Sequence, residues 1–238
     1  MDNMAAQATR VVSRRDALGA LGAAGAALAL GCGGSAPTSP STTVASPSAT
    51  VSTNGTCVVT PTETVGPFPS LSDIIRSDVR ENKQGAVLSL TIKVVNTTAN
   101  CANVTGAQVE IWQCDAAGNY SQYGSQTGQT YLRGIQTTNG FGEVNFTTIY
   151  PGWYQGRATH IHVEVSTGGV SRKVTQIAFP ESTSSAVHAT GVYASRGSNP
   201  TTNAQDNVFS DGFAGELVNP SGNPLTGYAA SFQVALAL

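Results

Sequence analysis

Charged side chains are scarce in this chain. Only 11% of its 238 residues are Asp, Glu, Lys or Arg, and the formal net charge is -2. A nucleic-acid-binding surface needs a concentrated excess of Lys and Arg, so the composition argues against that class of partner. One uncharged run, from Ala17 to Leu30, stands near the start of the chain. It is about 14 residues long, which is too short for a confident membrane span.

Helical periodicity is also missing. Beyond the first 32 residues, no stretch of about 12 residues repeats apolar side chains at helical spacing. The best candidate for a short helical turn is 70–80. Glycine and proline are abundant instead, at 26 and 11 residues, and Thr, Ser and Val are frequent. Short strands joined by turns have this composition.

Period-two alternation of apolar and polar side chains marks the expected strands. They are 85–95, 109–112, 144–148, 160–165, 173–179 and 232–238. Asn139-Gly140 is a strong signal for a hairpin turn. We therefore predict an all-β fold, a β-sandwich formed by residues 57–238 with long active-site loops. A core of that size is ample for independent folding.

Residues 1–32 have the order of an export signal. Arg14 and Arg15 form a twin-arginine pair ahead of the uncharged run, and Cys32 follows a small residue. We expect a twin-arginine signal, hence a periplasmic, extracellular or cell-surface protein, although Ala17 stands where such signals often have Phe. The alternative is an alanine-rich leader. Cys32 is either a lipidated residue that tethers the protein to a membrane or a thiol removed with the signal.

Residues 33–56 contain Ser, Thr, Pro, Ala and Gly, with no charge. Such a tract buries too little apolar surface to offset the entropy of ordering, so we predict a disordered linker. It serves either as a tether for the folded domain or as an inert spacer.

Three cysteines follow the linker, at Cys57, Cys101 and Cys114. In an oxidising compartment two of them are expected to pair and one to remain, and the sequence does not say which. The alternative is a buried set of thiols with no bridge. A zinc site is not indicated, because no CxxC or Cys-His spacing is present.

Histidine is rare, and two of the three histidines are His160 and His162. Residues i and i+2 of a strand share a face, so the two imidazoles project side by side. They form a metal site, a solvated polar face or a pair that hydrogen-bonds to a neighbouring strand. Tyr154 in the preceding loop favours the metal, and phenol oxygens favour ferric iron over zinc. A second phenol would come from Tyr120 or, as the competing choice, Tyr123.

Three motifs occur in order along the domain. They are PTETVGPF at 61–68, VEIWQCDAAGNY at 109–120 and YPGWYQGRATHIH at 150–162. Together they resemble the intradiol ring-cleavage dioxygenases, such as protocatechuate 3,4-dioxygenase and catechol 1,2-dioxygenase, and in particular their exported bacterial members. The resemblance covers most of residues 57–238 and implies the same β-sandwich that the strand pattern predicts.

The resemblance also implies a cofactor and a reaction. The implied cofactor is non-haem Fe(III), and the implied substrates are a catechol-type aromatic and O2. Its implied protein ligands are Tyr120, Tyr154, His160 and His162. Both oxygen atoms would enter the ring, which opens to a cis,cis-muconate-type diacid. No residue of the sequence reports on the substituents of that ring.

Further roles follow from the same resemblance. Tyr154 matches the ligand that the catechol displaces, Arg157 matches the arginine that stabilises charge on the ring, and Gln176 matches a glutamine behind the ligands. Ala158 departs from the family, which often has proline there, and this puts the path of the loop in question. Arg157 has an alternative role in a structural ion pair.

Other conspicuous residues have simpler interpretations. Packing roles are expected for Trp112, Tyr150 and Trp153. An alternative for Trp153 is to line the substrate pocket at the metal site. His188 lies among Ser, Ala and Thr and is expected to be solvated. Asp206 is expected to stabilise a loop rather than to bind a metal. Arg133 either reaches the pocket or covers the end of a strand.

Two other functions compete with the dioxygenase. One is a tethered β-sandwich binding module that has kept the fold and lost the chemistry. The other is a zinc hydrolase in which Glu164, on the same strand face, joins His160 and His162. Such a zinc site would not need tyrosines.

Overall fold

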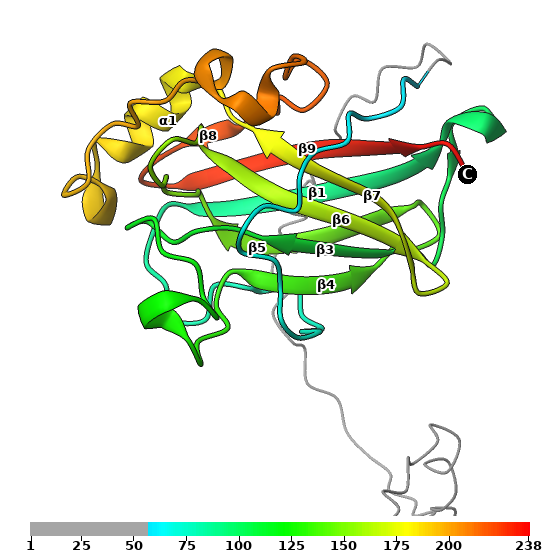
Figure 1. Cartoon of the computed structure of the whole chain (residues 1–238), viewed down its shortest axis with the longest axis horizontal. Coiled ribbons are helices and arrows are strands. Elements are labelled where there is room, and N and C mark those ends of the chain that lie inside the picture. The colour runs from blue at the N-terminus through cyan, green and yellow to red at the C-terminus, as the bar shows by residue number, and fades with distance from the viewer. Residues whose placement is uncertain (1–56) are drawn as a thin grey trace, which may run out of the picture. The chain divides into compact units, whose positions relative to one another are not determined.

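The computed structural model describes residues 57–238, which form two packed β-sheets (Figure 1). The expectations for the export signal, Cys32 and the linker concern residues 1–56 and lie outside the described residues. In the described part, no helix is both long and apolar enough to cross a membrane.

The first sheet has five strands arranged around β1. Its order is β2 (Ala102–Asn103), β1 (Val87–Asn96), β9 (Gly227–Leu236) and β8 (Ser221–Asn223), and β5 (Glu143–Ile149) also pairs with β1. The β1–β9 pair is parallel, whereas β2 and β5 run antiparallel to β1. The first and last long strands of the domain, β1 and β9, therefore lie side by side in one sheet.

The second sheet has four antiparallel strands and carries most of the polar residues of interest. Its order is β4 (Arg133–Thr137), β3 (Gln108–Trp112), β6 (His160–Thr167) and β7 (Val170–Ala178). All of the strands predicted by alternation are present in these two sheets, so the predicted all-β sandwich is confirmed.

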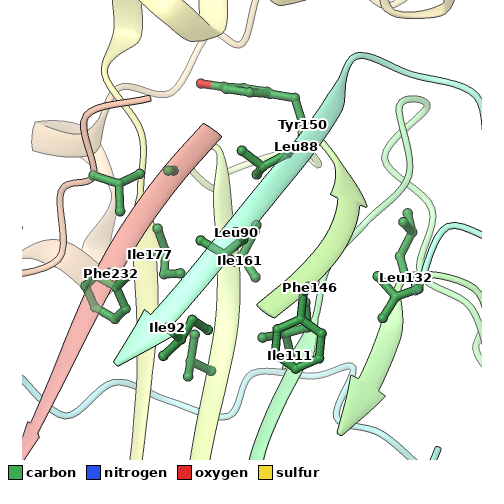
Figure 2. Close-up of a cluster of buried hydrophobic side chains, with 14 of the residues drawn as sticks. Leu88, Leu90, Ile92, Ile111, Leu132, Phe146, Tyr150, Ile161, Ile177 and Phe232 are labelled. Carbon is green, nitrogen blue, oxygen red and sulfur yellow. The ribbon is translucent and has the colours of Figure 1, made fainter. Parts of the chain in front are cut away.

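The core lies between the sheets, where alternate residues of each strand meet. Leu88, Leu90 and Ile92 of β1 are almost fully buried against Ile161 of β6 and Ile177 of β7. Figure 2 shows these side chains converging from the facing strands. Because alternate residues face the core, the intervening residues of β6 and β7 point to the outer face, where the histidines lie.

One α-helix and five short 3-10 helices complete the domain. They are η1 (Thr97–Ala99), η2 (Gly124–Gln126), α1 (Glu181–His188), η3 (Gly191–Tyr193), η4 (Asn203–Gln205) and η5 (Asn207–Phe209). Figure 1 shows α1 and the loops that follow it gathered at one end of the sandwich. Long loops were predicted without residue bounds. The structure has them at 113–132 and 189–220, where the only named elements are short 3-10 helices.

The prediction of a helical turn at 70–80 is wrong. This segment is largely extended, with bridges from Ile75 to Ile135 and from Asp78 to Thr147. The Ile135 amide donates to the Ile74 carbonyl at 2.7 Å. Pairing with strands distant in the sequence satisfies the backbone groups that a helix would have used.

The hairpin predicted at Asn139-Gly140 is also wrong in its pairing. A turn is present, but β4 before it and β5 after it belong to different sheets. Gly142, at φ 72°, takes the left-handed conformation instead of Asn139 and Gly140. The two-residue hairpin turn needs positive φ at both central residues, so this connection crosses between the sheets instead.

A disulfide joins Cys57 to Cys101, and Cys114 is a buried free thiol. The expectation that two cysteines pair and one remains is confirmed, and the structure supplies the pairing that the sequence left open. The bridge holds the start of the described chain against the turn that follows β1.

Candidate metal centre

A row of polar and aromatic side chains crosses the outer face of the second sheet. The register places Trp112 opposite both Arg133 and His162, and His162 opposite Gln176. His160 lies two residues before His162 on β6. The strand period therefore brings the predicted residues of β6 and β7 to one face and one end of the sheet.

His160 and His162 point their Nε2 atoms at the same place. These two nitrogens are 3.2 Å apart, and both side chains are buried. The Nδ1 of His160 lies 2.7 Å from the Ala158 carbonyl oxygen, so it carries the proton and donates it there. The lone pair of its Nε2 is therefore directed towards His162 and is available to a cation.

His162 is oriented by packing rather than by a hydrogen bond. Its ring stacks on Trp112 with the centroids 4.7 Å apart and the planes 4° apart. Among the described residues, its Nδ1 has no hydrogen-bond partner. Gly66, at φ 71°, also lies close to this ring, and a Cβ added there would come 3.0 Å from His162 Cε1. Trp112 is thus buried as predicted, and it also fixes a predicted ligand.

Tyr120 reaches the histidines from the loop that follows β3. Its hydroxyl oxygen lies 3.3 Å from His160 Nε2, and the side chain is buried. Phe68 stacks on the Tyr120 ring at a centroid distance of 4.7 Å. This loop is shaped by Asp115, which accepts hydrogen bonds from the Ala117 and Asn119 amides and so turns the chain back towards the sheet.

Tyr154 completes the group from the loop before β6. Its ring centroid lies 5.6 Å from that of Tyr120 and 5.9 Å from that of His160. It is half-buried, unlike the other three residues. The structure therefore brings together all four side chains that the sequence suggested as ligands, with Tyr154 the most accessible.

Tyr123, the competing choice, lies apart from the histidines. Its hydroxyl donates to the Pro69 carbonyl at 2.8 Å, and its ring packs against Phe68. Tyr123 therefore supports the segment that carries Phe68. Of the two tyrosines left open by spacing, Tyr120 is the one whose hydroxyl reaches the imidazoles.

Burial keeps these groups uncharged in the absence of a cation. It lowers the pKa of His160 to about 3, helped by the positive charge of Arg157, and lowers that of His162 well below its ordinary value. It raises the pKa of Tyr120 well above 10. The site therefore offers neutral imidazoles, as a metal needs, and a phenol that loses its proton only when a strong positive charge is bound.

Arg157 and Gln176 form a hydrogen-bonded group beside the histidines. The Nε of Arg157 donates to both carboxylate oxygens of Asp206, each at 2.8 Å, and its Nη2 donates to Gln176 Oε1. Gln176 Nε2 donates to the Thr64 carbonyl at 3.0 Å. The structural ion pair offered as the alternative for Arg157 is present and buried. Its role in stabilising charge on a substrate ring stays a prediction.

Asp206 stabilises a loop, as expected, and it also links that loop to the chain just before His160. Its Oδ2 also accepts the Ala158 amide at 2.7 Å, and its Oδ1 accepts the Val208 amide at 3.0 Å. The carboxylate thus joins the distant 206–209 turn to the chain just before His160. The Thr202–Asn207 segment gives no motif that would have announced this contact.

Arg133 serves neither of the purposes expected of it. It is fully buried and donates to the Ser121 carbonyl and hydroxyl and to the Phe68 carbonyl, at 2.7 to 3.0 Å. It therefore ties the Tyr120 loop to the segment that carries Phe68. This role of Arg133 depends on its burial at the start of a strand, and burial cannot be seen in the sequence.

The solvated position expected for His188 is wrong. His188 is 1% exposed at the end of α1, and its Nε2 lies 3.2 Å from the Pro151 carbonyl oxygen. The small residues around it in the sequence allow α1 to pack closely, which buries the ring. Tyr150 is buried as expected, with its hydroxyl 2.8 Å from Ser184 Oγ, and Trp153 is half-buried.

The donor set does not suit zinc hydrolysis. In residues 57–238 no three His, Cys, Asp or Glu side chains gather in a way that would hold a metal, so Glu164 does not join the histidines. Two imidazole nitrogens and two phenol oxygens remain. Phenolates are hard anionic donors, and two of them offset much of the charge of a trivalent ion, so the residues present fit ferric iron.

Comparisons with known proteins identify the family of this chain. A family model described as Dioxygenase matches residues 66–197, which is more than half of the chain. The chain belongs to the intradiol ring-cleavage dioxygenases. They are oxidoreductases, so this family member is an enzyme. The resemblance of its three motifs to the family is confirmed, and the likeness to exported bacterial members stays a prediction.

Solved structures and a curated relative resemble this dioxygenase to different extents. An intradiol ring-cleavage dioxygenase from Tetranychus urticae is 30% identical with a TM-score of 0.71, covering 76% of this chain and 95% of that one. The dioxygenase domain of a carbohydrate-binding fusion protein from Streptomyces sp. SirexAA-E is 27% identical with a TM-score of 0.58, covering 76% and 99%. A catechol 1,2-dioxygenase of Candida albicans is 37% identical over 30% of each chain, so the match spans under a third of that protein.

Proposed function

We propose that this chain is a non-haem ferric dioxygenase that cleaves a catechol-type aromatic between its two hydroxylated carbons. Both atoms of O2 enter the product, a cis,cis-muconate-type diacid. The observation that carries the proposal is the convergence of three side chains on His160 Nε2, which lies 3.3 Å from Tyr120 Oη and 3.2 Å from His162 Nε2, with the ring of Tyr154 beside them. A ferric ion held there would bind the catechol through its oxygens and prepare the ring for attack by O2.

Tyr154 is the residue best placed to make room for the substrate. It is half-buried, whereas Tyr120, His160 and His162 are 4%, 3% and 1% exposed. A catechol arriving from solvent therefore meets Tyr154 first. Its phenolate oxygen could also accept a proton from a catechol hydroxyl at hydrogen-bond distance.

Arg157 would hold charge that develops on the ring. Asp206 fixes its Nε and Gln176 fixes its Nη2. Among the described residues no hydrogen bond engages its Nη1, which leaves one N–H edge for the substrate. A guanidinium fixed in advance stabilises negative charge without reorganising, which is the usual basis of electrostatic catalysis.

The test is spectroscopic first and kinetic second. Full-length protein loaded with Fe(III) should be red-brown, because phenolate-to-iron charge transfer absorbs broadly in the visible. Catechol should shift that band, and oxygen uptake should follow. Tyr120→Phe and Tyr154→Phe should each bleach or shift the band, while Tyr123→Phe, the matched control, should leave it in place.

Two outcomes would contradict the proposal. A colourless protein that takes up no iron would remove the ferric site altogether. Loss of the band in Tyr123→Phe, with retention in Tyr120→Phe, would show that the ligands are assigned to the wrong loop residue.

We further propose that the enzyme works outside the cytoplasm. The support is the order of a twin-arginine pair, an uncharged run and Cys32 in residues 1–32. Replacing Arg14 and Arg15 with Lys should retain the protein in the cytoplasm, and Cys32→Ser should release an exported protein from the membrane fraction. Unchanged fractionation in both variants would contradict export by this route and anchoring by Cys32.

A further inference from the structure

A pocket of about 570 Å³ lies beside the turn that carries Tyr154. Its lining residues are Ala117, Trp153, Gln155, Ser195, Arg196 and Pro200. Two of them flank Tyr154 in the chain, and Ala117 belongs to the loop that carries Tyr120. None of the four candidate ligands lines the pocket, so it is a neighbour of the metal centre rather than part of it.

The pocket adjoins the most accessible of the four candidate ligands. Tyr154 is half-buried, whereas the other three are buried, and its chain neighbours Trp153 and Gln155 line the pocket. A substrate ring that passes Tyr154 therefore leaves its outer end near Trp153 and Gln155. A substituent on that end is the part of the molecule that the pocket would meet.

The pocket carries one formal charge, and that charge is positive. Arg196 is the only charged residue in the lining, and its Cζ lies 4.2 Å from the centroid of the Trp153 ring. Within residues 57–238, no carboxylate forms an ion pair with Arg196, although other arginines of the domain do have such partners. Gln155 and Ser195 add neutral hydrogen-bond donors to the same lining.

Contacts on two sides hold Arg196 and Trp153 in place. Trp153 Nε1 donates to the Gly197 carbonyl at 2.9 Å, which fixes the plane of the indole. Gly118, at φ 85°, packs so closely that an added Cβ would lie 3.0 Å from Arg196 Cζ. The guanidinium of Arg196 therefore contacts both the loop of Tyr120 and the ring of Trp153, while the residue as a whole remains exposed to an approaching ligand.

We infer that this pocket binds the carboxylate of a catechol acid whose ring occupies the metal centre. The inference rests on the proposed function and specifies its substrate class. Arg196 pairs with the carboxylate, and the Trp153 face covers the chain that links it to the ring. A guanidinium suits a carboxylate because its N–H groups match both oxygens.

The experiment compares an acid with its own neutral ester. Iron-loaded full-length enzyme is assayed with 3-(3,4-dihydroxyphenyl)propanoate and with its methyl ester, which have the same ring and linker. The wild type should prefer the acid in kcat/KM. Arg196→Gln should lower the acid-to-ester ratio about tenfold, the range expected for a charged hydrogen bond. Arg196→Lys should retain part of the preference.

Arg172→Gln is the matched control. Arg172 is exposed on β7, where its Nε donates to Thr167 Oγ1, and it does not line the pocket. The variant removes the same charge from the protein and should leave the ratio unchanged. An equal fall in both variants would show only a general effect of net charge and would overturn the inference.

A binding measurement separates this inference from the proposed function. 3-Phenylpropanoate has the carboxylate but no catechol hydroxyls, and its binding should quench the fluorescence of half-buried Trp153 saturably. Arg196→Gln should weaken that quench about tenfold. Turnover of catechol without any preference for the acid, and without quenching, would overturn the subsite alone. Absence of the visible band and of turnover, with quenching intact, would overturn the proposed function and leave an aromatic-acid site.

Discussion

The two histidines of the centre are held by different physical means. His160 is fixed by a hydrogen bond that sets both its ring orientation and its tautomer. His162 is held by stacking on the indole of Trp112 and by the close approach of Gly66, and neither contact sets its tautomer. Packing therefore orients His162, whereas a hydrogen bond orients His160. Trp112 supplies that packing and so contributes to the site.

Trp112→Leu tests this role. The leucine keeps an apolar side chain at the position but removes the flat surface under His162, so Fe(III) should bind about tenfold more weakly, the lower end of effects seen for residues that orient metal ligands. The measurement is a metal titration followed in the visible band. Trp112→Phe, which keeps an aromatic face, should lose much less. Equal affinities in wild type and Trp112→Leu would contradict the orienting role.

Glu63 is a second residue whose environment has a measurable consequence. It is 9% exposed, and in the described structure its Oε1 has no hydrogen-bond partner. Burial raises its pKa from 4.5 to about 7, the negative charges of Glu216, Asp211 and Asp206 add to the rise, and Arg157 opposes it. The folded state therefore holds a proton there that the unfolded state has already released.

The sign of the pH effect follows from that difference. Stability from this proton is fully present below about pH 4.5 and is lost as the pH rises through 7. Glu63→Gln, neutral at every pH, should melt at a higher temperature than wild type at pH 8, by about 2 °C or more. The gap should shrink at pH 5. Parallel melting curves across this range would show that Glu63 is not protonated in the fold.

Sequence reasoning was most successful at this scale where a family motif exists. Tyr120, Tyr154 and the two histidines were named through the resemblance, whereas spacing alone left Tyr120 and Tyr123 open. Gly66 and Asp206 were not connected to the histidines. Their effects depend on contacts between segments distant in the chain, and no local pattern encodes such contacts.

At the scale of elements, the site depends on loops pinned to strands. The strands supply His160, His162 and Gln176 in register, while Tyr120 and Tyr154 come from loops that other segments hold. The alternation of side chains predicted β3, β6 and β7 of the second sheet but not its edge strand β4. It did not predict which strands pair across the Asn139-Gly140 turn, because pairing is decided by the sandwich as a whole.

Asp206→Asn tests whether the 206–209 turn positions Arg157. An amide has one acceptor oxygen and no charge, so it cannot receive Arg157 Nε and the Ala158 amide as the carboxylate does. We expect kcat/KM for catechol to fall about a hundredfold, with most of the loss in kcat and the visible band preserved. Asp211→Asn, an exposed neighbour, serves as control. A wild-type kcat in Asp206→Asn would contradict the positioning role.

At the scale of the whole molecule, the domain is closed at its beginning by the disulfide. Cys57 and Cys101 are 44 residues apart, and a loop of that length restricts the unfolded chain by about 4 kcal/mol. Replacing both with Ser should lower the melting temperature by about 10 °C for a domain of this size. Iron binding at room temperature should survive. An unchanged melting temperature would mean that the bridge does not form in the protein.

The fold could be predicted as a whole because its strands are regular, and the parts that could not be predicted are those that join them. The local sequence of 70–80 favours a helical turn, yet the segment pairs with β4 and β5. His188 was predicted to be a solvated loop residue, but it ends α1 and is buried against the Pro151 backbone. In each case a distant neighbour decides the outcome, through the backbone pairing or packing that it supplies.

The most direct test of the central claim follows the oxygen atoms. Full-length, iron-loaded enzyme is given catechol under ¹⁸O2, and the product is identified by mass spectrometry. The account predicts a cis,cis-muconate-type diacid in which both new oxygens are labelled. A ring opened outside the two hydroxylated carbons, or a product whose new oxygens come only from water, would contradict it.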